Sequence, residues 1–84
     1  MDKIDPTLAK MILSDPQSAY KVLISCTTNC QPVLDTLSSM GVAAGKALLA
    51  LNIITASMTG PQIEEVAASP AVERIELDDE AKTQ

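Results

Sequence analysis

The chain has no histidine, no phenylalanine and no tryptophan, and its single aromatic residue is Tyr20. Without histidine it lacks the usual general base of enzymes and the commonest zinc ligand. It also has no glycine-rich phosphate loop, and neither of its two cysteines has a candidate base nearby in the sequence. These absences predict a protein that is not an enzyme and has no cofactor. They also predict an aliphatic core, for which the 46% of hydrophobic residues is sufficient.

Basic residues are scarce as well, with six Lys and Arg against eleven Asp and Glu and a net charge of −5. No cluster of Lys or Arg is present, which argues against binding to the phosphates of nucleic acids. Acidic residues gather in the last third of the chain, including the run Asp78-Asp79-Glu80. A partner whose surface is positive, or carries the positive end of a dipole, suits this charge better.

Long hydrophobic runs are missing too. The start of the chain, MDKIDPTLAKMIL, has no basic segment followed by a long apolar stretch. We therefore expect no signal peptide, no membrane span and no membrane partner, and a cytoplasmic location. A chain of 84 residues is long enough for one domain but not for two.

Local signals divide the chain into helices and strands. Asp5 is a typical N-cap and Pro6 suits the first helical position, so a short helix starts there. Gly41 is the residue expected just after the next helix, and Thr59 opens a capping-box pattern before the last one. After the first helix we expect a strand at 20–25, a helix at 31–40, strands at 46–50 and 53–58 joined by a turn at Asn52, a helix between Thr59 and Ser69, and a strand at 72–77.

The resulting order is β-α-β-β-α-β after a short N-terminal helix. This order predicts a ferredoxin-like α+β fold, an antiparallel four-stranded sheet with both helices on one face. The opposite sheet face then has no helix to cover it. We divide the chain into an N-terminal extension with a short helix (1–19), a ferredoxin-like domain (20–77) and a C-terminal tail (78–84). The helix positions expected in the core are Val33, Leu37, Met40, Ile63, Val66 and Ala67.

Four consecutive segments of the second half follow a pattern. A strand of small residues that ends in an apolar residue and Thr (TASMT) precedes a helix (PQIEEVAA), a Ser-Pro-x-Val turn (SPAV) and a strand with an acidic end (ERIELDD). In this order they resemble the second half of subtilisin propeptides and of the related inhibitors of subtilisin-like serine proteases. The resemblance runs from about Tyr20 to Gln84 and is clearer after Gly45. The N-terminal segment, the CxxxC connection and the lack of core aromatics depart from the family pattern, which leaves the target protease open.

The resemblance implies a protein inhibitor of a subtilisin-like serine protease, with assistance to the folding of that protease as a second role. In such inhibitors the uncovered sheet face rests on two helices of the protease. On this sequence that face would include Leu23, Thr55 and Ser57. Glu76 and Asp78 match the acidic positions that approach the N-termini of the protease helices, where a carboxylate accepts unpaired backbone N–H groups and meets the positive end of the dipole.

The resemblance also gives the polar C-terminus a role, as an extended strand in the substrate cleft. Such a strand binds mostly through its backbone, so its side chains can be unremarkable. The carried-over positions place Gln84 in the first substrate pocket, Thr83 in the second, Lys82 toward solvent and Ala81 in the fourth pocket. A frayed terminus is the alternative interpretation of the same residues.

Cys26 and Cys30 support a different function, because they fall in the loop between the first strand and the first helix of the ferredoxin-like domain. Soft-metal-binding domains of this fold place two thiolates in that loop, which could hold Cu(I) or Zn(II). Those domains have two residues between the cysteines, whereas CTTNC has three. A reversible disulfide is a further alternative, and two free thiols that pack like small hydrophobic side chains are the favoured interpretation.

A regulatory or oligomerisation module is the third interpretation, because domains of this fold can pair through their uncovered sheet faces. We expect the free chain to be a monomer or a weak dimer. A module of this kind should not depend on Ala81–Gln84, whereas an inhibitor should.

Overall fold

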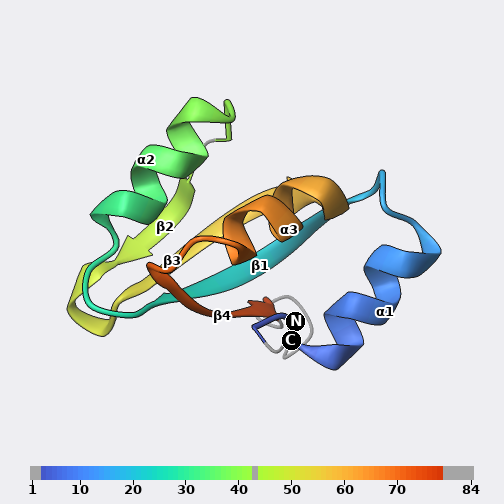
Figure 1. Ribbon diagram of the computed structural model, residues 1–84, viewed down its shortest axis with the longest axis horizontal. Coiled ribbons are helices and arrows are strands. Elements are labelled where there is room, and N and C mark those ends of the chain that lie inside the picture. Colours follow the sequence, from blue (N-terminus) through green and yellow to red (C-terminus); the bar gives the residue numbers. More distant parts are fainter. Residues whose placement is uncertain (1–2, 43, 79–84) are drawn as a thin grey trace.

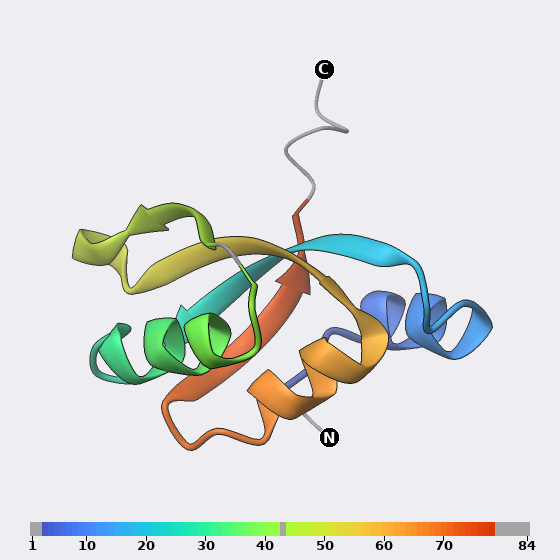
Figure 2. The same cartoon turned by 90° about the horizontal axis from the view of Figure 1, so that it is seen from above.

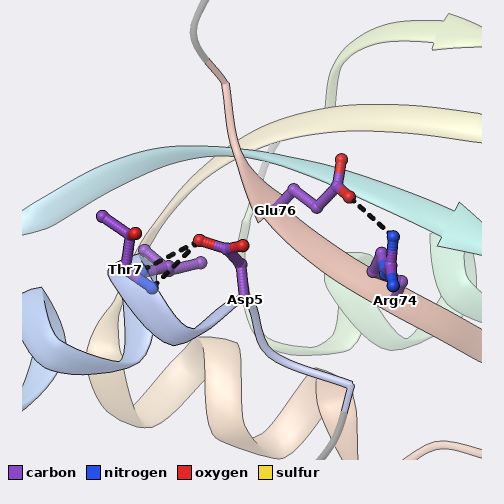
Figure 3. A network of polar contacts seen from close by, with 5 residues as sticks. Asp5, Thr7, Arg74 and Glu76 are labelled. Atoms are coloured by element: carbon purple, nitrogen blue, oxygen red, sulfur yellow. Dashed lines mark hydrogen bonds and ion pairs between the residues drawn. The ribbon is translucent and has the colours of Figure 1, made fainter.

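The first helix forms where the sequence predicts it. The computed structural model describes residues 3–42 and 44–78, and in it α1 spans Pro6–Ser14. The Asp5 carboxylate accepts a hydrogen bond from the backbone N–H group of Thr7 (3.1 Å; Figure 3) and another from that of Leu8 (3.3 Å). These bonds satisfy two of the N–H groups that have no partner within the helix.

The remaining elements give the ferredoxin-like α+β fold that the sequence predicts. The sheet has four antiparallel strands in the order β2-β3-β1-β4. Helices α2 and α3 both lie on one side of it, and α1 lies beyond α3 on the same side (Figures 1 and 2). The elements after α1 are β1 (Ala19–Cys26), α2 (Gln31–Ser39), β2 (Ala44–Leu48), the short 3₁₀ helix η1 (Leu49–Leu51), β3 (Ile53–Thr59), α3 (Gly60–Ala67) and β4 (Val72–Leu77).

The core lies between the sheet and the helices and is almost entirely aliphatic. Side chains alternate between core and opposite face along β1 and β3, the period of a strand with one buried face. Of the predicted helical core positions, Met40 is partly buried and the other five are buried. The residues that are almost inaccessible to solvent are Leu8, Val22, Ile24, Val33, Leu37, Ile54, Met58, Ile63, Val66, Val72 and Ile75.

Strand β2 begins and ends two residues earlier than the sequence predicts. Residues Leu49–Leu51 form the 3₁₀ helix instead of extending the strand. Asn52 then makes the turn into β3 with a positive φ of 58°, a conformation that asparagine tolerates better than most residues. Gly41 directly follows Met40, the C-cap of α2, and has a positive φ of 76°. It is therefore the residue just after the helix, as predicted.

Gly60 allows a close contact at the start of α3. Its backbone N–H donates to the carbonyl oxygen of Pro16 (2.9 Å) in the connection between α1 and β1. A Cβ atom at this position would lie 2.7 Å from the Ile12 side chain and 3.0 Å from that same carbonyl oxygen. The capping box predicted just before it also forms, with the Thr59 N–H donating to the Gln62 side chain (3.0 Å).

The N-terminal segment pairs with the outer edge of β4. Ile4 forms a parallel bridge with Ile75, whose N–H donates to the carbonyl oxygen of Lys3 (2.7 Å). The N–H of Asp5 in turn donates to the carbonyl oxygen of Ile75 (2.9 Å). This pairing covers part of a sheet edge that would otherwise present unpaired backbone groups.

Helix α1 is packed into the same core as the rest of the domain. Leu8 and Ile12 are buried in the main hydrophobic cluster. The Tyr20 hydroxyl donates to the carbonyl oxygen of Asp15 (2.6 Å) and lies 2.9 Å from that of Met11, which ties the end of the helix to β1. The boundary at residue 19 therefore divides the chain along the sequence but not in its packing.

Candidate functional site

The face of the sheet opposite the helices carries three rows of side chains. The strand register places Leu23 of β1 between Thr55 of β3 and Glu76 of β4. Residues directly opposite each other on antiparallel strands point to the same side, so each row is continuous across the sheet. We call this surface the open face; it comprises Lys21, Leu23, Ser25, Ile53, Thr55, Ser57, Arg74, Glu76 and Asp78.

The three residues that the resemblance assigns to protease contact lie together on the open face. Leu23 and Thr55 are cross-strand partners and both are half-buried. Ser57 is exposed and lies opposite Lys21 in the neighbouring row. None of the three is large and charged, so the centre of the face leaves room for another flat surface to approach.

Gly45 of β2 lies beside Thr55 and has no side chain that could project from the open face there. A Cβ atom at Gly45 would lie 2.9 Å from the Thr55 hydroxyl oxygen, closer than such atoms normally come. Any other residue would have to displace the Thr55 side chain or the strand. A glycine inside a strand often marks a close approach, so the sequence did carry this signal, which our sequence analysis missed.

The acidic residues of the face lie at the end of β4. Glu76 is half-buried and forms an ion pair with Arg74, with 3.1 Å between Nη1 and Oε2 (Figure 3). The Asp78 N–H donates to the carbonyl oxygen of Lys21 (2.9 Å), which continues the ladder one step past the strand. Both carboxylates therefore belong to the open face, and they lie on adjacent rows.

Sequence analysis also missed the role of Arg74. The register pairs Cys26 with Val72 but Ser25 with Arg74, so β4 contains one extra residue, Glu73. This β-bulge lets Val72 and Ile75, three residues apart, both face the core, whereas Arg74 and Glu76, two residues apart, share the open face by the ordinary alternation of a strand. A polar hollow of 420 Å³ lies here, lined by Ser25, Glu73, Arg74 and Glu76. The β4 side of the open face thus carries charged side chains of both signs, whereas Leu23 and Thr55 beside it are uncharged.

The cysteines lie where β1 ends, next to Ser25, and form a disulfide bond. Cys26 ends the strand and Cys30 is the N-cap of α2, and both are buried. Their Cα atoms are 5.4 Å apart, within the normal range for a disulfide. The favoured interpretation of two free thiols is therefore wrong, because a short loop between strand and helix brings the two sulfurs together.

The disulfide also bears on the metal-binding alternative. Both sulfurs are bonded to each other, so a metal could bind them only after reduction. Within residues 3–42 and 44–78 no group of three or more His, Cys, Asp or Glu side chains is placed to hold a metal ion.

Reduction of the disulfide is expected to lower the free energy of unfolding by about 2 kcal/mol, since the bond closes a short loop and a short loop constrains the unfolded chain modestly. Urea unfolding with and without a reductant measures the difference. The Cys26→Ala/Cys30→Ala variant is the control and should not respond to the reductant. Equal unfolding midpoints for the oxidised and reduced wild type would contradict this expectation.

Comparisons with known proteins return no relative. No family model, no curated protein and no solved structure matches the chain. None of the helices in the described part of the chain is long and apolar enough to cross a membrane. The tail residues Ala81–Gln84, which the resemblance places in a protease cleft, lie outside the described residues.

Proposed function

We propose that this protein is an inhibitor of a subtilisin-like serine protease. Its open face rests on two helices of the protease, and the chain beyond β4 lies in the substrate cleft. The observation that carries the proposal is the placement of Leu23, Thr55, Ser57, Glu76 and Asp78 on one face of the sheet, opposite the helices. Assistance to the folding of the same protease would use the same surface.

The shape of the open face supports docking against helices. Its central row holds a half-buried Leu and Thr, and Gly45 adds no side chain beside them. A partner helix can therefore approach the sheet closely over this region. Close approach is what a contact needs in order to bury apolar surface and exclude water.

The charges of the open face support the choice of helix N-termini as the partner surface. Glu76 and Asp78 lie next to each other where β4 ends. A carboxylate at a helix N-terminus typically contributes about 0.3–1 kcal/mol, and more when it is partly buried. Glu76 must then exchange its contact with Arg74 for the new one, which costs little because both side chains of the pair are in contact with solvent.

The test is titration of a bacterial-type subtilisin with the purified chain, with residual hydrolysis of a peptide substrate as the readout. Ser57→Arg should weaken inhibition by about tenfold or more, because it puts a long charged side chain at the contact. Ser38→Arg is the matched control, since it makes the same change at an exposed position on α2, away from the open face. Equal inhibition by the two variants would contradict docking through the open face, and absence of inhibition by the wild type would overturn the proposed function.

A further inference from the structure

A second surface lies on the helix side of the molecule, away from the open face. It is an apolar groove of 310 Å³ between α1, α3 and the N-terminal segment. Its lining residues are Ile4, Ala9, Ile12, Leu13, Glu64 and Ala67, five apolar residues and one carboxylate. The groove is thus suited to an aliphatic group with a cation beside it.

The rim of this groove exposes an aliphatic side chain. Leu13 of α1 is 82% exposed, the highest value among the large hydrophobic residues that the structure describes as exposed. Met11, on the same helix, is 36% exposed. The same short stretch therefore offers both an apolar hollow and an apolar side chain that could fill one.

The groove also has one charge of each sign near it, a carboxylate on α3 and an ammonium group on α1. Glu64 of α3 is the single charged residue among those lining it. Lys10 lies three residues before Leu13 and so on the same side of α1, and it is exposed. Within the described residues neither Lys10 nor Glu64 takes part in an ion pair.

We propose that the occupant of this groove is Leu13 of a second copy of the chain. In a two-fold symmetric dimer each copy presents the same patch, so every contact is made twice. Leu13 of each copy enters the groove of the other, and Lys10 of each faces Glu64 of the other. The contact uses the helix side, which leaves both open faces uncovered; it does not depend on the function proposed for the open face.

The apolar part of the proposal is tested by sedimentation velocity over a series of concentrations from about 1 µM to 1 mM, the range in which weak dimers form. Leu13→Ser is expected to raise the dissociation constant about a hundredfold, because two leucines leave the interface at once. Leu51→Ser is the matched control, since Leu51 is also exposed (65%) but lies in η1, away from the groove. It should leave the dissociation constant unchanged.

The charged part is tested by a charge swap. Lys10→Glu and Glu64→Lys should each raise the dissociation constant by about tenfold, since each turns two attractions into two repulsions. The double variant, and an equimolar mixture of the two single variants, restore both opposite-charge contacts and should associate like the wild type. Glu65→Lys, the same change at the next residue of α3, is the control and should have no effect.

Three results would overturn the proposal. A wild-type chain that stays monomeric at 1 mM has no such interface. A dimer that Leu13→Ser leaves intact is formed elsewhere, for example through the open face. A double charge variant that associates no better than the single variants rules out the contact between Lys10 and Glu64. Circular dichroism of each variant shows that the fold is retained, so that loss of the dimer is not loss of structure.

Discussion

Deletion of Ala81–Gln84 is expected to raise the inhibition constant against subtilisin about a thousandfold and to leave the free energy of unfolding unchanged. The proposed inhibitor binds its protease in two places, and the tail supplies the one in the substrate cleft. An extended strand there binds through backbone hydrogen bonds, each contributing about 0.5–1.5 kcal/mol. Three or four such bonds together amount to about 4 kcal/mol, which is a factor of about a thousand in affinity.

The experiment compares inhibition constants and urea unfolding curves for the full and the shortened chain. Lys82→Ala is the control within the tail, because the resemblance places Lys82 toward solvent, and it should inhibit like the wild type. Nanomolar inhibition by the shortened chain would exclude a role for the tail in the cleft. Docking of the protease on the open face would still be tested separately, by the Ser57→Arg variant.

Leu8→Ala is expected to lower the free energy of unfolding by about 3 kcal/mol, within the range of 2–5 kcal/mol measured for leucines removed from protein cores. Leu8 lies on α1 and is fully buried in the main cluster. A domain of this size has a total stability of about 4–13 kcal/mol, so the loss is a large share of it. The prediction follows from the packing of α1 against the sheet and α3.

The control is Leu13→Ala, the same substitution five positions further along the same short helix. Leu13 is 82% exposed, and its removal should change stability by less than about 0.5 kcal/mol when the chain is studied at a concentration where it is monomeric. Urea unfolding followed by circular dichroism measures both variants. A small effect of Leu8→Ala would mean that α1 is only loosely attached and that 20–77 is the stable unit.

The two proposed surfaces use different parts of the fold. The open face is made by strands, and the groove by α1, α3 and the segment before α1. Variants of one surface should therefore leave the other unaffected. The Ser57→Arg variant should dimerise with the same dissociation constant as the wild type, and the Leu13→Ser variant should inhibit the protease with the same inhibition constant. Each proposal can therefore fail alone.

The amino-acid sequence was sufficient to predict the order of the elements and the ferredoxin-like fold. The signals are local: Asp5 and Pro6 start α1, Gly41 follows α2, and alternation in 53–58 marks β3. Each acts over a few residues, through a cap, a backbone conformation or a side-chain period. Such signals can be recognised in one stretch of chain without knowing what it packs against.

The tertiary structure alone decided which distant residues meet. Ile4 lies beside Ile75 because the start of the chain pairs with the last strand, and a β-bulge in β4 sets the register in which Cys26 of β1 lies opposite Val72. The groove at Leu13 likewise exists only because α1 packs beside α3. The free energy that selects these contacts comes from burial shared among many side chains, so no single segment carries the signal for them.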